Sequence, residues 1–470
     1  MNAFRLTRAR AARRLAMRWQ RQLIFLLGGV VVGAAAVGFT LLADAAQFEL
    51  GRLLSIWPYA CLAITPLGFM ASVYLAKRFF PNSQGSGIPQ AIAARQLQER
   101  SARDRLVSIR IAVGKVLLTA FGLLCGASIG REGPTVQVGA SVMYAAGRMA
   151  PRRQPGLILA GAAAGVAVAF NTPIAGIVFG IEEMARSFEA RTSGLVIATV
   201  IVAGLTSLAL TGDYTYFGKT TAALHGMVDW AAVPICGIVG GLAGGLFSRL
   251  LILFARGLPG RLGLWIKQNP LAAAFLFGLG VALCGIASGN ATFGTGYAQA
   301  RGMLDGTAPP SLSFGILKFA ATALSAISGV PGGIFSPSLA VGAGIGADIA
   351  HLMPGASVGP VVLLGMVAYF AGVVQAPITA FVIVTEMTGN HAMLVPLMAA
   401  AFIAHGMSRL VCEEGVYHAL AANYRVQAAR GRHPAWCNRR AGGSLHVAPP
   451  PPRPAPIEGA GERERGRGRR

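Results

Sequence analysis

The stretch VLLTAFGLLCGASIGREGPTVQVGASVMYAAG, residues 116–147, indicates the kind of fold. Two uncharged runs, 116–130 and 133–147, flank the charged pair Arg131 and Glu132. Each run is shorter than the roughly 20 residues that a helix needs to cross a bilayer. Short, glycine-interrupted segments that meet at membrane depth are typical of a transporter binding site. The stretch therefore predicts broken helices within a membrane protein.

The composition of the whole chain agrees with a membrane protein. Apolar residues make up 54% of the 470 residues and charged residues 13%, with a mean hydropathy of +0.57. A soluble domain carries about 25% charged residues, and 18 acidic residues cannot supply a charged surface here. The six cysteines are scattered without a CxxC pair, which excludes a disulfide-rich secreted scaffold. We predict an all-α polytopic membrane protein.

The net charge of +23 gathers in three segments. Residues 1–22 hold seven arginines and no acid, residues 430–470 hold ten arginines against three acids, and the expected loop 77–115 holds eight basic residues against two acids. The positive-inside rule predicts that these segments, and hence both termini, face the cytoplasm. The ratio of 36 arginines to 5 lysines favours a GC-rich bacterial genome and thus a bacterial inner membrane. A nucleic-acid partner is excluded because no basic folded face with stacking aromatics is visible.

The uncharged runs predict the individual spans. Five runs each suit one membrane helix: 22–43, 53–76, 192–212, 230–248 and 387–408. Residues 268–300 and 349–385 are too long for one straight span, so they must bend or hold two helices. Pro173 and Pro377 lie inside long apolar runs and mark breaks or helix starts.

An internal repeat is readable in the chain. A shift of 203 residues superimposes Lys115 on Lys318 and Pro134 on Pro337, and a shift of 204 superimposes Pro173 on Pro377 and Glu182 on Glu386. Substrate commonly binds where two such halves of a transporter meet. The predicted organisation is a basic N-terminal segment, a first repeat, a linker, a second repeat and a disordered basic tail rich in proline and arginine: 1–22, 23–213, 214–229, 230–425 and 426–470.

Three short stretches share one design: Gly85–Pro89, Gly130–Pro134 and Gly333–Pro337. Each joins glycine to a proline ahead of an apolar helical run. Proline suits the first turn of a helix, and glycine permits an unusual backbone before it. The result is a loop whose free N–H groups form an anion site at a positive helix end. The alternative is that all three are ordinary turns between helices.

Three glutamates stand beside uncharged runs. Glu132 lies among the predicted anion-binding N–H groups, where its carboxylate can occupy the position of the anion and leave on protonation. Its alternative role is to satisfy helix-start N–H groups or to pair with Arg131. Of the adjacent Glu182 and Glu183, which point about 100° apart on a helix, one could pass protons in the interior. The alternative for this pair is a solvated helix end, and Glu386, the repeat equivalent of Glu182, suggests a structural role.

Other kinds of chemistry find no support in the sequence. The stretch Gly212–Thr220 nearly reads as a phosphate-binding loop but has one residue too many and no preceding strand. No HExxH motif, metal-ligand spacing or Ser-His-Asp context is visible, so no cofactor or metal is predicted. A membrane-embedded enzyme that uses Glu132 or the Glu182/Glu183 pair remains an alternative.

These stretches together resemble the CLC family of chloride channels and proton/chloride antiporters, over about residues 20–425. The resemblance rests on five motifs: GSGIP at 85–89, GREGP at 130–134, GGIFSP at 332–337, AFNTPIAGIVFGIEEM at 169–184 and GVYHAL with Tyr417. It implies a CLC-type fold of two inverted-topology repeats with tilted and broken helices, and a homodimer with one ion pathway per subunit. The implied function is the exchange of chloride for protons, and a passive chloride channel on the same fold is the alternative.

The resemblance also implies roles for individual residues. Glu132 would be the gating glutamate that carries a proton, and Glu183 the internal proton-transfer glutamate, which favours an antiporter. Ser86 favours chloride over nitrate and fluoride. The implied chloride-binding residues are Ser86, Ile334, Phe335, Tyr417, Gly130, Arg131 and Gly133.

Two residues depart from the pattern of the family. Gln90 stands where many relatives have glutamate, and Ser336 replaces the alanine that is common in bacterial relatives. Neither departure changes the predicted function. The C-terminal tail is too short for paired nucleotide-binding CBS domains, so no regulation of that kind is expected.

Overall fold

The computed structural model describes residues 2–149, 153–185, 190–212, 215–307 and 312–430. Within these ranges the chain is helical and contains two isolated β-bridges but no strand. The α-helices are α1 (Asn2–Ile56), α2 (Cys61–Phe79), α3 (Ile88–Gln96), α4 (Arg100–Asp104), α5 (Ile109–Leu124), α6 (Glu132–Ala146), α7 (Gln154–Phe170), α8 (Pro173–Phe179), α9 (Ala190–Thr211), α10 (Met227–Arg256), α11 (Gly260–Gln268), α12 (Pro270–Ala287), α13 (Tyr297–Leu304), α14 (Phe314–Ile327), α15 (Phe335–Leu352), α16 (Val358–Val374), α17 (Pro377–Thr388), α18 (Leu394–Val411) and α19 (Val416–Arg430). The described residues also form two short 3-10 helices, η1 (Pro58–Ala60) and η2 (Gly147–Met149), and the π-helical turn η4 (Gly180–Ala185).

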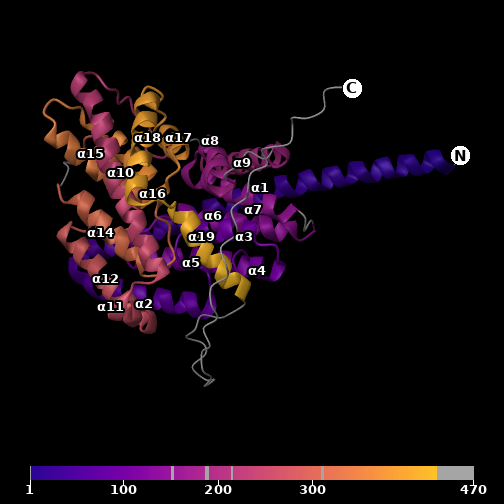
Figure 1. Ribbon diagram of the computed structural model, residues 1–470, viewed down its shortest axis with the longest axis horizontal. Helices are drawn as coiled ribbons and strands as arrows, with labels where there is room; N and C mark the ends of the chain where they lie inside the picture. Colours follow the sequence, from indigo (N-terminus) through magenta and orange to yellow (C-terminus); the bar gives the residue numbers. More distant parts are fainter. Residues whose placement is uncertain (1, 150–152, 186–189, 213–214, 308–311, 431–470) are drawn as a thin grey trace, which may run out of the picture. The chain divides into compact units, whose positions relative to one another are not determined.

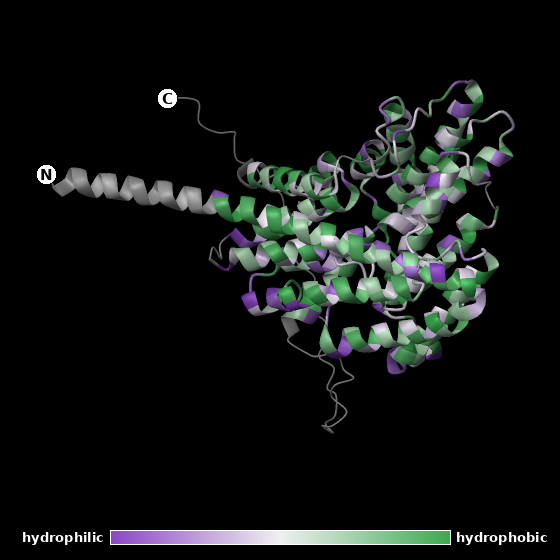
Figure 2. Cartoon of the chain, turned by 180° about the vertical axis from the view of Figure 1, so that it is seen from behind, coloured by the Kyte–Doolittle hydropathy of each residue, from purple (hydrophilic) through white to green (hydrophobic). Residues whose placement is uncertain are grey.

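The surface of these helices is apolar, as a bilayer requires. Seven helical segments in the described ranges are long and apolar enough to cross a membrane. Large hydrophobic side chains such as Leu27, Leu41 and Leu205 are more than half exposed, and hydrophobic residues run along the helices throughout the molecule (Figure 2). Water would disfavour such a surface, whereas lipid tails cover it at no cost. The predicted polytopic helical membrane protein is thus confirmed.

Several expected helix boundaries are confirmed. Pro173 and Pro377 begin α8 and α17, and residues 268–300 are divided between α12 and the first turn of α13. The two proline starts share a further feature, because Asn171 and Gln375 end the preceding helices in the left-handed conformation. This backbone is uncommon for residues other than glycine. At Gln375 it is accompanied by hydrogen bonds from the side-chain amide to Ser408 Oγ and to the Cys412 carbonyl.

Four expected segments differ from the structure in their bounds. The predicted span 22–43 is part of α1, which continues to Ile56, because its charged residues beyond position 43 still favour a helix and Pro58 ends it. The predicted span 387–408 is broken, since α17 ends at Thr388 and left-handed Gly389 stops it without any charge to signal the break. Residues 77–115 are not one loop, because α3, α4 and the start of α5 lie there. The predicted tail overlaps α19 up to Arg430, and residues 431–470 lie outside the described residues.

Helices from corresponding parts of the two halves pack in the same way. α6 lies against α7 in the first half, and α15 lies against α16 in the second. The last helix, α19, crosses between the halves and packs on α3 and α10 (Figure 1). This crossing brings a segment from the end of the chain to the GSGIP motif near its beginning.

Close contacts between glycines set the packing of α6 on α7 and of α15 on α16. A Cβ on Gly139 would collide with the carbonyl oxygen of Gly161, and a Cβ on Gly161 would collide with that of Gly139. Gly342 and Gly365 make the same reciprocal contact between α15 and α16. Small residues let membrane helices approach closely, so each crossing depends on its pair of glycines.

We expect Gly161→Ala to destabilise the protein. The added methyl group must push α7 away from the backbone of α6, and overpacking of this kind costs about 1–3 kcal/mol. Gly38→Ala in α1 is the matched control, because nothing lies within 4 Å of its added Cβ and alanine favours a helix. The midpoint of thermal unfolding in detergent should fall for Gly161→Ala and stay level or rise for Gly38→Ala. Equal midpoints for the two variants would contradict this account of the crossing.

Candidate functional site

The three glycine–proline stretches that the sequence singled out meet in space. Gly130 and Gly333 exchange two backbone hydrogen bonds, with N···O distances of 2.8 and 2.7 Å. The GSGIP loop joins them, because the N–H of Gly332 donates to the carbonyl of Gly85 at 3.0 Å. We call the meeting point of residues 85–89, 130–134 and 333–337 the loop junction.

Glycine permits the close approach of the three loops. A Cβ on Gly133 would collide with Ser86 Oγ, and a Cβ on Gly333 would lie 2.9 Å from the backbone nitrogen of Gly133. Gly87, which precedes α3, has a φ of +99° and lies close to Gly133 as well. Side chains at these positions would force the loops apart, so the glycines set the geometry of the junction.

Helix N-termini converge at the loop junction. α3, α6 and α15 all begin there, and no side chain of their N-cap residues accepts a hydrogen bond from the first turn. The first N–H groups of a helix have no partner within the helix and carry partial positive charge. The arrangement suits a bound anion because it offers N–H donors without a full positive charge.

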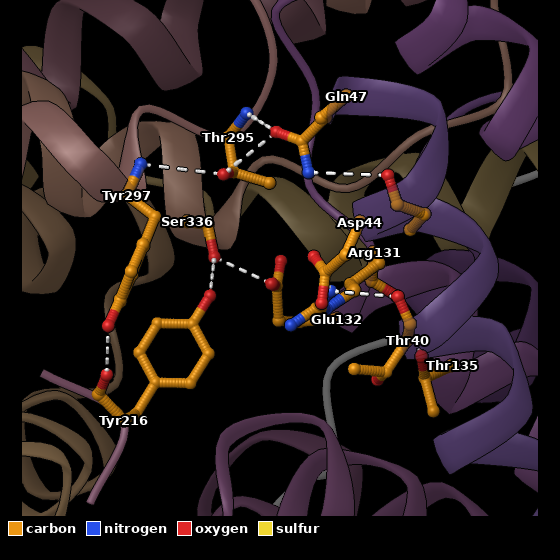
Figure 3. A network of polar contacts seen from close by, with 11 residues as sticks. Thr40, Asp44, Gln47, Arg131, Glu132, Thr135, Tyr216, Thr295, Tyr297 and Ser336 are labelled. Atoms are coloured by element: carbon orange, nitrogen blue, oxygen red, sulfur yellow. Dashed lines mark hydrogen bonds and ion pairs between the residues drawn. The ribbon is translucent and has the colours of Figure 1, made fainter. Parts of the chain in front are cut away.

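Glu132 occupies this junction. Its side chain is buried at the first residue of α6, and Ser336 Oγ donates a hydrogen bond to Oε1 at 2.6 Å (Figure 3). The amide groups of Glu132 and Ser336 interact with the same carboxylate. Oε2 faces Gly130 and makes no hydrogen bond within the described residues. The carboxylate therefore lies where the helix ends would hold an anion.

Arg131 directs its guanidinium away from this carboxylate toward α1. It forms an ion pair with Asp44 and donates to the carbonyl of Thr40 at 3.1 Å (Figure 3). The side chain of Arg131 is buried, whereas Asp44 is half-exposed. What Arg131 offers to the loop junction is its backbone, which links Gly130 to Glu132.

Two buried hydroxyl groups lie beside the junction. Ser86 Oγ packs on Gly133, and the ring of Tyr417, at the start of α19, contacts the ring of Phe335 with centroids 5.8 Å apart. Tyr417 and Ser86 lie close enough to interact with each other, and neither hydroxyl makes a hydrogen bond to another group within the described residues. Unsatisfied hydrogen-bonding capacity of a buried polar group costs about 1–3 kcal/mol. Because the two hydroxyls also lie beside the N-terminus of α15, the pair is placed to bind an anion.

Phe335 lies at the centre of an aromatic cluster. Its ring contacts those of Phe170, Phe179, Phe370 and Tyr417, with centroids 5.0–6.0 Å apart. Phe335 is the first residue of α15 and fully buried, and Ile334 is the N-cap of this helix. The cluster fixes the N–H end of α15 beside the two buried hydroxyls.

Glu183 lies at a separate buried position in η4, the π-helical turn that continues α8. His418, the residue after Tyr417, places Nε2 2.8 Å from the carbonyl oxygen of Glu183 and 3.6 Å from its Oε1. Arg95 donates to the carbonyl of the next residue, Met184, at 3.2 Å. Single-turn π-helices are frequent at functional sites. α19 thus connects the Glu183 region with the loop junction through two consecutive residues.

Glu182 has a different task from its neighbour. Its carboxylate accepts hydrogen bonds from the N–H groups of Ile378 and Thr379 at the start of α17, at 3.1 and 2.6 Å. Glu386 does the same for Ile174 and Ala175 at the start of α8, at 3.2 and 2.7 Å. Each half thus caps a helix of the other half with the equivalent glutamate, and the structural role suggested for this pair is observed.

The two repeat-related lysines, Lys115 and Lys318, donate hydrogen bonds to backbone carbonyls. Lys115 Nζ donates to the carbonyl of Gly85 at 2.7 Å, and Lys318 Nζ donates to those of Thr292 and Gly294 at 2.9 and 2.8 Å. Gln90 is buried and donates to the carbonyl of Gln84 at 2.7 Å, which fixes the segment before the GSGIP loop. Lys115 and Gln90 thus hold the GSGIP loop of the junction, whereas Lys318 holds the segment before α13.

Sequence reasoning missed three contacts of the site. It noted Ser336 only as a departure, passed over Tyr216 within the rejected phosphate-loop stretch, and gave no role to His418. The signal for Ser336 was available, because a hydroxyl three residues from Gly333 must lie near the helix start. Nothing in the sequence signals Tyr216, which reaches Ser336 from the segment between the two halves, with 3.4 Å between the hydroxyl oxygens. Across the described part of the chain, no group of three or more His, Cys, Asp or Glu residues could hold a metal ion.

The fold and this junction define an integral membrane protein in which helix N-termini from both halves of the chain converge on one buried site. The family model described as Voltage gated chloride channel matches residues 67–409. The chain belongs to this family, known as the CLC family.

Relatives and solved structures agree with this assignment. The H(+)/Cl(-) exchange transporter ClcA of Yersinia pestis bv. Antiqua (strain Angola) is 32% identical, over 90% of this chain and 93% of the relative. The X-ray crystal structure of a slow cyanobacterial Cl-/H+ antiporter is similar with a TM-score of 0.73 and 25% identity, over 88% of this chain and 99% of that one. The crystal structure of a CLC-type fluoride/proton antiporter has a TM-score of 0.72 and 22% identity, over 85% and 96% of the two chains, and it supports the fold alone.

Proposed function

We propose that this protein is a secondary active transporter that exchanges chloride for protons. The observation that carries the proposal is the pair of adjacent buried hydroxyls of Ser86 and Tyr417 beside the N-terminus of α15, which make no hydrogen bond to any other group in the described residues. Hydroxyl and N–H donors without acceptors suit an anion. The relative named as an H(+)/Cl(-) exchange transporter, 32% identical over most of both chains, supports chloride as the anion and protons as the exchanged ion.

The site residues take the following roles in this proposal. Ser86, Tyr417 and the N–H groups of Ile334 and Phe335 hold a central chloride. The backbone of residues 130–133, which includes Gly130, Arg131 and Gly133, frames an outer anion position. Glu132 occupies that outer position as a carboxylate and leaves it when it takes up a proton. Its burial among helix N-termini supports this competition, since a carboxylate and chloride seek the same N–H donors.

In the same proposal, Glu183 is the internal proton-transfer residue, which passes protons between the cytoplasm and Glu132. Its buried position in the π-helical turn, near Tyr417, supports a separate path for protons. The neighbouring Glu182 is committed to the N-terminus of α17. The division of labour between the two glutamates follows from their different surroundings.

We also propose the organisation of the whole molecule. Residues 23–213 and 230–425 are the two repeats, joined by 214–229, and their paired glycine crossings and glutamate caps support this. The protein resides in a bacterial inner membrane with both termini in the cytoplasm, which the basic ends support.

A homodimer is part of the proposal. The short helices α8 and α17 pack together and expose Ile174 and Ile378 next to the partly buried Glu182 and Glu386. Carboxylates at a lipid-facing surface are costly, and a second copy of the chain on this face would cover them. The mass of the purified protein in detergent, corrected for bound detergent, should equal two chains, and the mass of one chain would contradict this part of the proposal.

Chloride flux tests the proposed transport directly. Purified protein is reconstituted into liposomes with high internal chloride, and a potassium ionophore carries the compensating charge. A chloride electrode should record rapid release of chloride that empty liposomes do not show. Absence of release above that of empty liposomes would refute chloride transport by this protein.

A further inference from the structure

Ser336 donates a side-chain hydrogen bond to the Glu132 carboxylate. It is the second residue of α15 and only 5% exposed, and its hydroxyl donates to Oε1 at 2.6 Å. Figure 3 shows the hydroxyl of Ser336 between the Glu132 carboxylate and the hydroxyl of Tyr216. Hydrogen bonds to an ionised group are about twice as strong as bonds between neutral groups.

The hydroxyl of Ser336 is oriented by Tyr216. The two hydroxyl oxygens are 3.4 Å apart, and a hydroxyl has one proton to donate. Because the hydroxyl proton of Ser336 is donated in the hydrogen bond to Glu132, the bond between Ser336 and Tyr216 must use the hydroxyl proton of Tyr216. Tyr216 is itself fixed, since Tyr297 Oη donates to its carbonyl at 2.7 Å and Phe170 packs edge-on against its ring at 5.8 Å.

We propose that Ser336, oriented by Tyr216, is a positioning residue that retains the Glu132 carboxylate in the anion position and thereby weakens the competition of chloride for that position. The proposal rests on the function proposed above, in which the carboxylate and chloride alternate at one site. A hydroxyl bound to a carboxylate favours the ionised, site-occupying form. Its loss should shift the balance toward chloride by about tenfold, the size typical of a bond to a charged group.

A single variant would not separate the loss of the bond to the Glu132 carboxylate from the loss of a direct contact to chloride. When chloride replaces the carboxylate, the same hydroxyl can donate to chloride, so Ser336→Ala could also remove a chloride contact. A double-mutant cycle with Glu132→Ala separates the two effects, because in that background there is no carboxylate to retain. The proposal therefore predicts a coupling between the two positions.

The experiment measures chloride binding by titration calorimetry of the purified full-length protein. Four proteins are compared: the unchanged chain, Ser336→Ala, Glu132→Ala and the double variant. Ser336→Ala should lower the apparent Kd for chloride about tenfold when Glu132 is present, and this decrease should disappear in the Glu132→Ala background. An equal change in both backgrounds, no change, or weaker binding only when Glu132 is present would overturn the proposal.

Further variants guard against a trivial effect on folding. Tyr216→Phe keeps the aromatic ring and removes only the orienting hydroxyl, so it should shift the Kd in the same direction by less, and again only when Glu132 is present. Ser338→Ala, in the same helix, is the matched control, because its buried hydroxyl makes no hydrogen bond within the described residues. It should leave the Kd unchanged. If Ser336→Ala does not fold, the Tyr216→Phe pair decides the question, and an equal shift in both backgrounds would overturn the proposal.

Transport gives a second readout that a purely structural role would not move. Ser336→Ala should lower the chloride concentration for half-maximal flux relative to the unchanged protein, whereas Ser338→Ala should not. The outcomes also separate this proposal from the one it rests on. If none of the four proteins binds or transports chloride, the proposed function fails, whereas chloride binding without coupling between positions 132 and 336 overturns only the role of Ser336.

Discussion

Glu132→Gln is expected to abolish proton transport while chloride continues to flow. Glutamine has nearly the same shape as glutamate, but its amide does not take up and release a proton at physiological pH. The carboxylate is buried among helix N-termini at the loop junction, so a neutral side chain there no longer competes with chloride as an anion. Exchange should become passive chloride conduction.

The measurement follows both ions in liposomes, with a chloride electrode and a pH electrode. The proton signal should fall to that of empty liposomes, and the chloride signal should persist. Glu49→Gln is the matched control, because this glutamate lies on the exposed side of α1 and its loss should change neither flux. Proton transport that survives in Glu132→Gln would refute the gating role of Glu132. The persistent chloride flux also shows that the variant is folded.

Glu183→Gln should affect proton transport, whereas Glu182→Gln should affect stability, although the two residues are adjacent. Glu183 is buried in the π-helical turn, next to His418, which follows Tyr417 along α19, so its replacement should stop proton transport and leave chloride flux. Glu182 accepts three hydrogen bonds at the start of α17, two from backbone N–H groups and one from Thr379 Oγ1. An amide retains only part of this cap.

Glu182→Gln should therefore lower stability and keep the coupling of protons to chloride. The expected loss is about 1–2 kcal/mol, the usual size for a weakened helix cap, and it should appear as a lower midpoint of thermal unfolding in detergent. The ratio of protons to chloride should equal that of the unchanged protein. If Glu182→Gln loses proton transport and Glu183→Gln retains it, the assignment of the two glutamates is reversed.

The three glycine–proline loops could be predicted from the sequence because their determinants are local. Glycine and proline fix the backbone around Glu132 whatever the rest of the chain does, and Pro173 and Pro377 fix two helix starts in the same way. The repeat offset then indicated that Glu182 and Glu386 act alike. It did not indicate that each caps a helix of the other half, because a shift in sequence carries no information on which elements meet.

The remaining features depend on packing between distant segments. The contact of Tyr216 with Ser336 joins residues 120 positions apart in sequence, and His418 reaches Glu183 only because α19 crosses to α3. The helix boundaries predicted from charge were wrong for a similar reason. α1 continues through charged residues up to Ile56, whereas α17 stops at an uncharged glycine. Backbone conformation, rather than hydropathy, decides where these helices end.

Proton movement driven by chloride alone tests the central claim most directly. Liposomes containing the purified protein start with equal pH on both sides and more chloride inside than outside, with a potassium ionophore to carry the compensating charge. As chloride leaves, the account predicts that protons enter and accumulate inside against their own gradient, and that empty liposomes show no such uptake. Chloride efflux without proton entry would contradict exchange and leave a passive chloride channel.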